Sequence, residues 1–184
     1  MGLQQSSQQN TLMNANVAEF TISKAHLSDA AALHRIYEGS PDYFALLGTE
    51  EPTAQETELE LGLALMDSRR HVELIRCGGE AAGLLDWKEA YPEPQDVTLN
   101  LLLLTPAHRR AGLGSAALQD LEGRLQGTAA RRLMASVLGE NPDAAHFLQR
   151  LGYRLAVHAG PAITWYAKPL GEQSIQHYAA PAEG

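Results

Sequence analysis

Cysteine is almost absent from this sequence, since Cys77 is the only one among 184 residues. A single cysteine cannot close an intrachain disulfide, which excludes the small disulfide-stabilised folds. The spacing of His, Cys, Asp and Glu side chains matches no metal-binding motif, so we expect no metal ion. Cys77 is expected to be a small apolar residue at the end of a strand rather than a nucleophile.

Basic residues and long apolar runs are also scarce. The chain has 14 Lys and Arg against 22 Asp and Glu, a formal net charge of -8. Because nucleic-acid binding needs clustered basic side chains, we expect no nucleic-acid partner. Apolar runs fall well short of the roughly 20 residues that span a membrane, and the first residues lack the features of a signal peptide. We therefore expect a cytoplasmic protein without a membrane partner, either a monomer or a homodimer.

The remaining composition is typical of a folded domain, with 45% hydrophobic and 20% charged residues. Residues 1–17 are rich in Gln, Ser and Asn and predict a disordered leader. Residues 171–184 are small and polar and predict a loose C-terminal tail. Residues 18–170 are long enough to bury a hydrophobic core, and we expect a single domain there.

Hydrophobic periodicity within this domain predicts a mixture of strands and helices. Strands are expected at 20–25, 71–76, 82–89, 97–104, 132–138, 154–158 and 162–167, and helices at 29–38, 53–68, 112–125 and 142–151. The second helix carries Leu59, Leu63 and Met66 at helical spacing. Residues 101–104 are all leucine and predict a central strand covered on both faces. This order predicts an α/β (α+β) fold with a mixed, mostly antiparallel twisted sheet of about seven strands flanked by helices.

The most informative segment follows the four-leucine strand. Residues 109–114, Arg-Arg-Ala-Gly-Leu-Gly, lead from the end of that strand into a helix. Unpaired amides and the dipole at a helix N-terminus attract anions. The glycines allow close approach of a ligand, and the two arginines add charge suited to phosphates. The segment therefore predicts a phosphate-binding loop.

Two known phosphate-binding motifs can be compared with this segment. The loop of nucleoside triphosphatases requires a lysine that is missing here. The dinucleotide fingerprint G-x-G-x-x-A matches residues 112–117, but its first glycine normally ends the strand. Seven residues separate Leu104 from Gly112 in this sequence. A nicotinamide-dependent oxidoreductase is therefore the weaker alternative.

Residues 109–114 resemble the R/Q-x-x-G-x-G/A loop of the GNAT superfamily of N-acetyltransferases. Downstream, residues 141–153 resemble the N-x-x-A-x-x-F/L-Y-x-x-x-G-F/Y segment of the same superfamily. The two motifs occur in the expected order, and the resemblance covers roughly residues 18 to 168. It implies an acyl-CoA N-acyltransferase fold. It also implies an enzyme that transfers an acetyl group from acetyl-CoA to a primary amine of a small molecule or peptide.

The resemblance further implies how coenzyme A is bound. The strand ending at Leu104 is expected to separate from its neighbour near residues 136–138, so that its backbone pairs with the pantetheine arm. An amide near Leu102 then polarises the thioester carbonyl. For Asn141, capping the following helix is an alternative to binding the pantetheine arm. The expected coenzyme-binding residues are Leu102, Leu103, Leu104, Arg109, Arg110, Ala111, Gly112, Leu113, Gly114, Ser115, Asn141 and Phe147.

The sequence departs from the superfamily at Leu148, where a tyrosine often protonates the leaving thiolate. Either another residue donates this proton or the thiolate leaves unassisted, which a thiol pKa of about 8.5 allows. Tyr153 is expected to fill the core instead of replacing the missing tyrosine. The departure keeps a second function open, an acyl-CoA-binding sensor or interaction module without turnover.

The acceptor amine needs a group that removes its proton or positions a water molecule. Asp86 is the first candidate base, Glu89 is a second, and Asn100 is the candidate for positioning water. For the two carboxylates, a solvated charge near the end of a strand is the alternative. The expected substrate-lining residues are Tyr37, Tyr43, Phe44 and Trp87, which as aromatic residues could equally fill the core.

Overall fold

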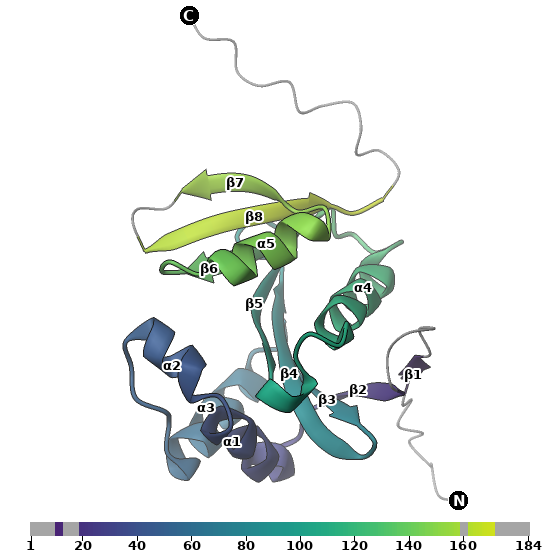
Figure 1. Cartoon of the computed structure of the whole chain (residues 1–184). Coiled ribbons are helices and arrows are strands. Elements are labelled where there is room, and N and C mark those ends of the chain that lie inside the picture. Colours follow the sequence, from purple (N-terminus) through teal and green to yellow (C-terminus); the bar gives the residue numbers. More distant parts are fainter. Residues whose placement is uncertain (1–9, 13–18, 159–161, 172–184) are drawn as a thin grey trace, which may run out of the picture.

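The computed structural model describes residues 10–12, 19–158 and 162–171. Within these residues the strands form one eight-stranded sheet in the order β1-β2-β3-β4-β5-β6-β8-β7 (Figure 1). Their bounds are β1 Asn10–Leu12, β2 Phe20–Lys24, β3 Arg70–Cys77, β4 Glu80–Glu89, β5 Asp96–Leu104, β6 Arg132–Leu138, β7 Arg154–His158 and β8 Ile163–Pro169. Neighbouring strands are antiparallel except β5 and β6, which are parallel. The predicted mixed, mostly antiparallel sheet is confirmed.

The helices cover both faces of this sheet. They are α1 Ala30–Glu38, α2 Pro41–Leu47, α3 Ala54–Met66, α4 Leu113–Leu125 and α5 Pro142–Arg150, with short 3-10 turns at Leu27–Asp29 and Pro106–His108. Helices α1 and α3 pack on one face around a cluster that includes Leu33, Leu61 and Leu103. Helices α4 and α5 pack on the other face around a second cluster that includes Leu118 and Leu148. Each face thus has its own hydrophobic core.

The structure adds two elements that the sequence did not predict. Residues 10–12 lie in the segment expected to be disordered, yet they pair with β2 as β1. The remainder of that leader, and of the predicted tail from residue 172 onward, lies outside the described residues. Helix α2 occupies residues between the helices expected at 29–38 and 53–68, where no element was predicted. Pro41 stands at its first position, where a fixed φ favours helix initiation, and Gly48 ends it with φ of 67°.

In helix α3, the apolar residues noted at helical spacing are not the ones that are buried. Its buried residues are Thr57, Leu61 and Ala64, whereas Leu59, Leu63 and Met66 are 63%, 60% and 82% exposed. The helix carries two apolar stripes on opposite sides, and spacing alone does not indicate which one faces the sheet. Thr57 is accommodated in the buried stripe because its hydroxyl donates to the carbonyl of Thr53 at 3.0 Å.

Strands β4 and β5 approach each other closely at Gly83, which pairs with Leu104. A Cβ atom at Gly83 would lie 2.4 Å from the carbonyl oxygen of Leu103 and 2.6 Å from a methyl carbon of Leu104. The close approach fixes the end of β5, from which the predicted phosphate loop departs.

We expect Gly83→Ala to lower the free energy of unfolding by about 1–3 kcal/mol, because the new methyl group overpacks a backbone contact. Urea denaturation measures the change. Gly123→Ala is the matched control: a Cβ at Gly123 in α4 meets nothing within 4 Å. It should stabilise the protein by up to about 1 kcal/mol through helix propensity. Equal stability of the two variants would contradict the tight packing at Gly83.

Candidate active site

The centre of the site is a gap in the sheet between β5 and β6. These strands pair only from Asp96 opposite Arg132 to Leu99 opposite Ala135. Beyond that point β5 continues to pair with β4, and β6 continues to pair with β8. Figure 1 shows the two strands diverging toward α2. The separation that the resemblance implied is therefore present, and it exposes the inner edge of each strand.

A cavity of about 810 Å³ opens along this gap. It is bounded by β5, β6, the loop before α4, the first turn of α4, α5 and, through Asp42 and Tyr43, α2. Ten of the expected coenzyme-binding residues line it, namely Leu102, Leu103, Leu104, Arg109, Arg110, Gly112, Gly114, Ser115, Asn141 and Phe147. The other two do not: Ala111 is exposed outside the lining, and Leu113 is buried in the core at 3% exposure.

The loop before α4 has the backbone of an anion-binding turn. Arg110 and Gly112 have φ angles of 64° and 83°, in the left-handed region. Such a conformation is strained for arginine, and strain of this kind is concentrated at functional sites. Gly112 caps α4 without a side chain that could bind the first amides of the helix. Those amides therefore remain available to an anionic ligand at the end of the cavity.

The two arginines of the loop have different surroundings. The Nε of Arg109 donates to the carbonyl oxygen of Leu104 at 2.8 Å, and its guanidinium also donates to both carboxylate oxygens of Asp42 in α2. The hydrogen bond from Arg109 lowers the pKa of Asp42. Arg110 is exposed and lines the cavity. Arg109 thus fastens the loop to β5 and α2, while Arg110 is the arginine open to a ligand.

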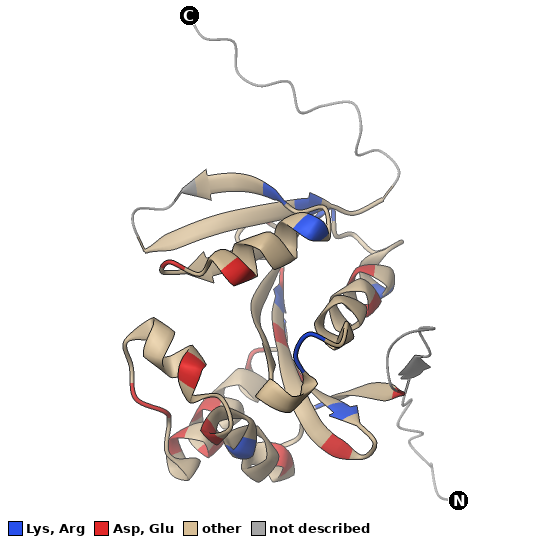
Figure 2. Ribbon diagram, in the orientation of Figure 1, with Lys and Arg blue, Asp and Glu red and all other residues tan. Residues whose placement is uncertain are grey.

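Charge is unevenly distributed around the cavity. Figure 2 shows acidic residues gathered on α1, α2, α3 and the loop between α2 and α3, whereas the loop before α4 is basic. The end of the cavity near the α4 loop therefore suits an anion. Of the acidic residues on α1 to α3, Asp42 lines the cavity, and its carboxylate is paired with Arg109.

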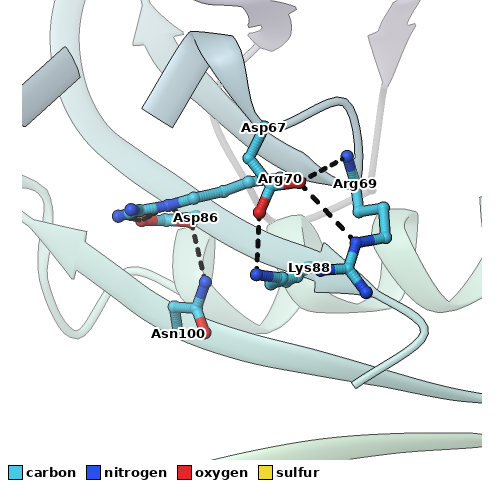
Figure 3. Close-up of polar contacts among 6 residues, drawn as sticks. All are labelled: Asp67, Arg69, Arg70, Asp86, Lys88 and Asn100. Carbon is cyan, nitrogen blue, oxygen red and sulfur yellow. Dashed lines mark hydrogen bonds and ion pairs between the residues drawn. The ribbon is translucent and has the colours of Figure 1, made fainter. Parts of the chain in front are cut away.

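At the side toward α3, Asp86, Arg70 and Asn100 form one hydrogen-bonded group (Figure 3). Arg70 opens β3 and donates to Asp86 of β4 through Nε, at 3.1 and 3.2 Å, and through Nη2 at 2.6 Å. Asn100 of β5 donates its Nδ2 to Asp86 Oδ1 at 3.0 Å. The hydrogen bonds to Asp86 raise the pKa of Arg70. No local sequence pattern indicated that Arg70 would belong to this group.

A β-bulge places Asn100 at the cavity. Asp86 pairs with Leu101 and Trp87 pairs with Leu99, so Asn100 is the extra residue of β5. Asn100 is exposed and lines the cavity. Asp86 is only 6% exposed and is not among the lining residues.

The hydrogen bonds to Asp86 limit its ability to act as the base that was expected from the sequence. Both oxygens of Asp86 accept hydrogen bonds from Arg70, and one also accepts from Asn100. Two N–H groups of Arg70 and one of Asn100 thus occupy about three of the four acceptor sites of the carboxylate. Asp86 also does not line the cavity, so an amine bound there does not meet the remaining site. The other candidate, Glu89, pairs with His71 at 2.9 Å and does not line the cavity.

The four aromatic candidates divide between the two faces of the sheet. Tyr43 lines the cavity and makes an edge-to-face contact with Phe44 at a centroid distance of 5.1 Å. Phe44 in turn contacts Tyr37 at 5.6 Å and is itself buried in the core. Burial raises the pKa of Tyr37 to about 12, with smaller contributions from Glu60 and Asp86.

Trp87 does not join this aromatic group, contrary to expectation. It belongs to the core under α4, where its ring stacks on His71 at 3.9 Å and its indole nitrogen donates to Glu73 at 3.1 Å. Adjacent residues of a strand point to opposite faces. Trp87 therefore lies on the face opposite Asp86, and it does not line the cavity.

Three further residues named from the sequence lie in or beside α5. Leu148 lines the cavity and is 4% exposed. Tyr153 is buried, and its hydroxyl donates to Glu122 at 2.9 Å, which confirms a core position. Asn141 caps α5, because its Oδ1 accepts from the amide of Ala144 at 3.0 Å, while the residue also lines the cavity.

Two other kinds of site are missing from the part of the chain that the structure describes. Within it, no three or more His, Cys, Asp and Glu side chains are grouped as metal ligands. None of its helices is long and apolar enough to cross a membrane.

Comparison with known proteins agrees with this geometry. Residues 32–153 match the acetyltransferase (GNAT) family. An acetyltransferase from Thermus thermophilus is 40% identical, with a TM-score of 0.80 over 84% of this chain and 99% of that chain. No curated protein matches the sequence.

More distant structures share the fold. RimL, a ribosomal L7/L12 α-N-protein acetyltransferase in complex with coenzyme A, is 17% identical, with a TM-score of 0.71 over 82% of this chain and 94% of that one. Spermidine N-acetyltransferase from Vibrio cholerae, in complex with CoA and spermine, is 14% identical, with a TM-score of 0.69 over 85% and 97%. The match over residues 32–153 and the 40% identity to a known acetyltransferase place this chain in the GNAT acetyltransferase family.

Proposed function

We propose that this protein is an N-acetyltransferase that moves the acetyl group of acetyl-CoA to a primary amine of a small molecule or peptide. The observation that carries the proposal is the cavity between β5 and β6, which ends at the N-terminus of α4 and the loop of residues 109–112. A long ligand with an anionic end fits this combination of an open strand edge and an anion-binding helix terminus.

Binding of the diphosphate falls to the start of α4. The amides of its first turn point toward the cavity end, and Gly112 allows close approach of phosphate oxygens. Arg110 supplies an exposed positive charge at the cavity. Arg109 acts on the loop itself, because its guanidinium is already held by Leu104 and Asp42.

The pantetheine arm pairs with the inner edge of β5. Residues 100–104 have no β6 partner, so the backbone groups on that side can bind the amides of the arm as an added strand would. The carbonyl of Leu104 already accepts from Arg109, which leaves residues nearer Leu102 as the main contacts. The thioester then lies between the bulge at Asn100 and α5.

The reaction is direct attack of a neutral amine on the thioester. A bond forms between the amine nitrogen and the acetyl carbon while the carbon–sulfur bond breaks. The nitrogen releases a proton to water, and the coenzyme A thiolate takes up a proton. Holding the two reactants in one cavity supplies most of the rate enhancement. Leu148 offers no acid, but a thiol pKa of about 8.5 makes the thiolate an adequate leaving group.

The acceptor enters from the side of α1 to α3. Tyr43 lines this side, and Tyr37 and Phe44 support it through edge-to-face contacts. The acidic surface of these helices favours a cationic acceptor (Figure 2). Of the distant structural relatives, one is an acetyltransferase of a ribosomal protein and another is an acetyltransferase of spermidine. The test of this protein should therefore include both peptide and small-molecule amines.

Turnover with an amine is the direct test of this proposal. Purified protein should release free thiol from acetyl-CoA when spermidine, propylamine or a short peptide with a free N-terminal amine is added, measured with a thiol-reactive chromophore. The rate should rise with pH because an amine of pKa about 10 must lose its proton to attack. Binding of acetyl-CoA without turnover across this panel would instead favour an acyl-CoA sensor, the alternative suggested by Leu148.

Diphosphate binding by the loop before α4 can be tested at its glycine. Gly112→Asp should abolish the thermal stabilisation by acetyl-CoA, which is about 2.7 kcal/mol at a hundredfold excess over Kd. The variant adds bulk and negative charge where the diphosphate binds. Gly127→Asp is the matched control, because Gly127 has a similar φ of 77° at the far end of α4. If Gly112→Asp kept the full shift, the diphosphate would bind elsewhere.

Arg109 and Arg110 are expected to differ in their contribution to coenzyme binding. Arg110→Asn should raise the KM for acetyl-CoA about tenfold, since a charge-assisted contact is lost, and the effect should shrink at high salt. Asparagine tolerates the left-handed backbone of this position. Arg131→Asn, at an exposed residue outside the cavity lining, is the control and should leave the KM unchanged. An unaltered KM in Arg110→Asn would contradict the role of Arg110.

A further inference from the structure

The geometry points to a role for Arg70 and Asp86 that rests on the proposed function: they are positioning residues that orient the amide of Asn100, whose Oδ1 binds the attacking amine. Arg70 was not a candidate from the sequence, and Asp86 was expected to act as a base. Their role follows from which atoms donate and which accept within the group in Figure 3.

The orientation of the Asn100 amide follows from its partner. Asn100 lies 3.0 Å from Asp86 Oδ1, and a carboxylate paired with arginine is ionised and only accepts hydrogen bonds. The Asn100 atom facing Asp86 is therefore the amino group, a donor. Its carbonyl oxygen must then point away from Asp86, as Figure 3 shows. Because Asn100 is exposed and lines the cavity, this oxygen is the group offered to a ligand.

Arg70 keeps Asp86 in the position that this orientation requires. The arginine binds both carboxylate oxygens, and such a two-point contact fixes the plane of the carboxylate. The pairs Arg70–Lys88 and Val72–Asp86 place Arg70 and Asp86 at diagonal positions on adjacent antiparallel strands. The pair is thus held by strands and not by loops. Its two charges offset each other, so the group adds no net charge beside the amine.

The β-bulge adds the final element. Asn100 is the extra residue of β5 between two regular pairs, which brings its side chain beside Asp86 and to the cavity. A strand without the bulge would not place this residue beside Asp86 while residues 101–104 keep their register.

An acceptor oxygen at this place assists the attack. The neutral amine has N–H groups and one lone pair, and a hydrogen bond from an N–H to Asn100 Oδ1 leaves the lone pair free to meet the thioester carbon. As the nitrogen–carbon bond forms, the nitrogen becomes positive and this hydrogen bond strengthens, which lowers the barrier. A flipped amide would present its amino group, which would compete for the lone pair.

A double-mutant cycle tests the proposal, using the amine of the panel above that the wild type acetylates fastest. Asn100→Ala should lower kcat/KM for the amine about tenfold, the loss of one hydrogen bond to a group that gains charge. Asp86→Asn should lower it by roughly three- to tenfold because the amide is no longer oriented. The double variant should be no worse than Asn100→Ala alone, since Asp86 then has nothing to orient. The KM for acetyl-CoA should stay constant throughout.

Two further variants guard against a merely structural loss. Asp86 is buried, so its replacement could impair folding, whereas the Arg70 side chain is 39% exposed. Arg70→Lys keeps the charge but loses the two-point contact, and it should lower kcat/KM in the wild type but not in Asn100→Ala. Asp67→Asn removes a neighbouring ion pair with Lys88 outside this group and should leave kcat/KM unchanged.

The results distinguish the failure of the proposed function from the failure of this inference. If the wild type acetylates no amine, the proposed function fails, whatever the variants do. If it does, and the losses in Asp86→Asn and Asn100→Ala multiply, then Asp86 acts independently and the inference is overturned. The pH profile gives a second criterion. Asp86→Asn should lower kcat/KM for the amine equally at all pH values, whereas loss of the acidic limb of the profile would identify Asp86 as the base.

Discussion

The constraint on which the rest of the structure depends is the loss of pairing between β5 and β6 after Leu99 and Ala135. Two strands in the middle of a sheet ordinarily satisfy each other's backbone groups, and groups left unpaired need another partner. Here β4 and β8 hold the outer edges of the two strands, so the sheet remains intact while its centre opens. A ligand with amide groups of its own fits such an edge, as does water.

The elements around the gap follow from this opening. Helix α4 begins at Leu113, after the loop that follows β5, and Gly112, Gly114 and Ser115 at its start line the same cavity as the open edge of β5. Arg109 joins these parts, because it binds the last carbonyl of β5 and the first turn of α2 together. The opposite end is set by the bulge at Asn100, where β3, β4 and β5 each contribute one residue to a hydrogen-bonded group. The loop before α4 and the hydrogen-bonded group at Asn100 thus lie at two ends of one opening.

Much of this was predictable from local patterns. Strands β6 and β7 have the predicted bounds. The loop predicted to bind phosphate leads into a helix as expected, because glycine, arginine and helix start are adjacent in sequence. Features that depend on distant residues were missed. The exposed stripe of α3 was one, since only the packing partner decides which side is buried. Arg70 was another, although the turn at Gly78 and Gly79 defines a hairpin register that sets it diagonal to Asp86.

The two hydrophobic clusters have a consequence for how such a protein can diversify. In the proposed function, the core under α4 and α5 would support the coenzyme end of the cavity, and the core under α1 and α3 would support the acceptor end. Substitutions that reshape the acceptor side would therefore change the packing of one hydrophobic core and leave the core that supports coenzyme binding largely unchanged. A lineage could exchange one amine for another by accumulating changes in α1 to α3, with little loss of affinity for a shared acyl donor. That independence would end at Asp42, which bonds across from α2 to Arg109, and at Leu103, which belongs to the core under α1 and α3 and also lines the cavity.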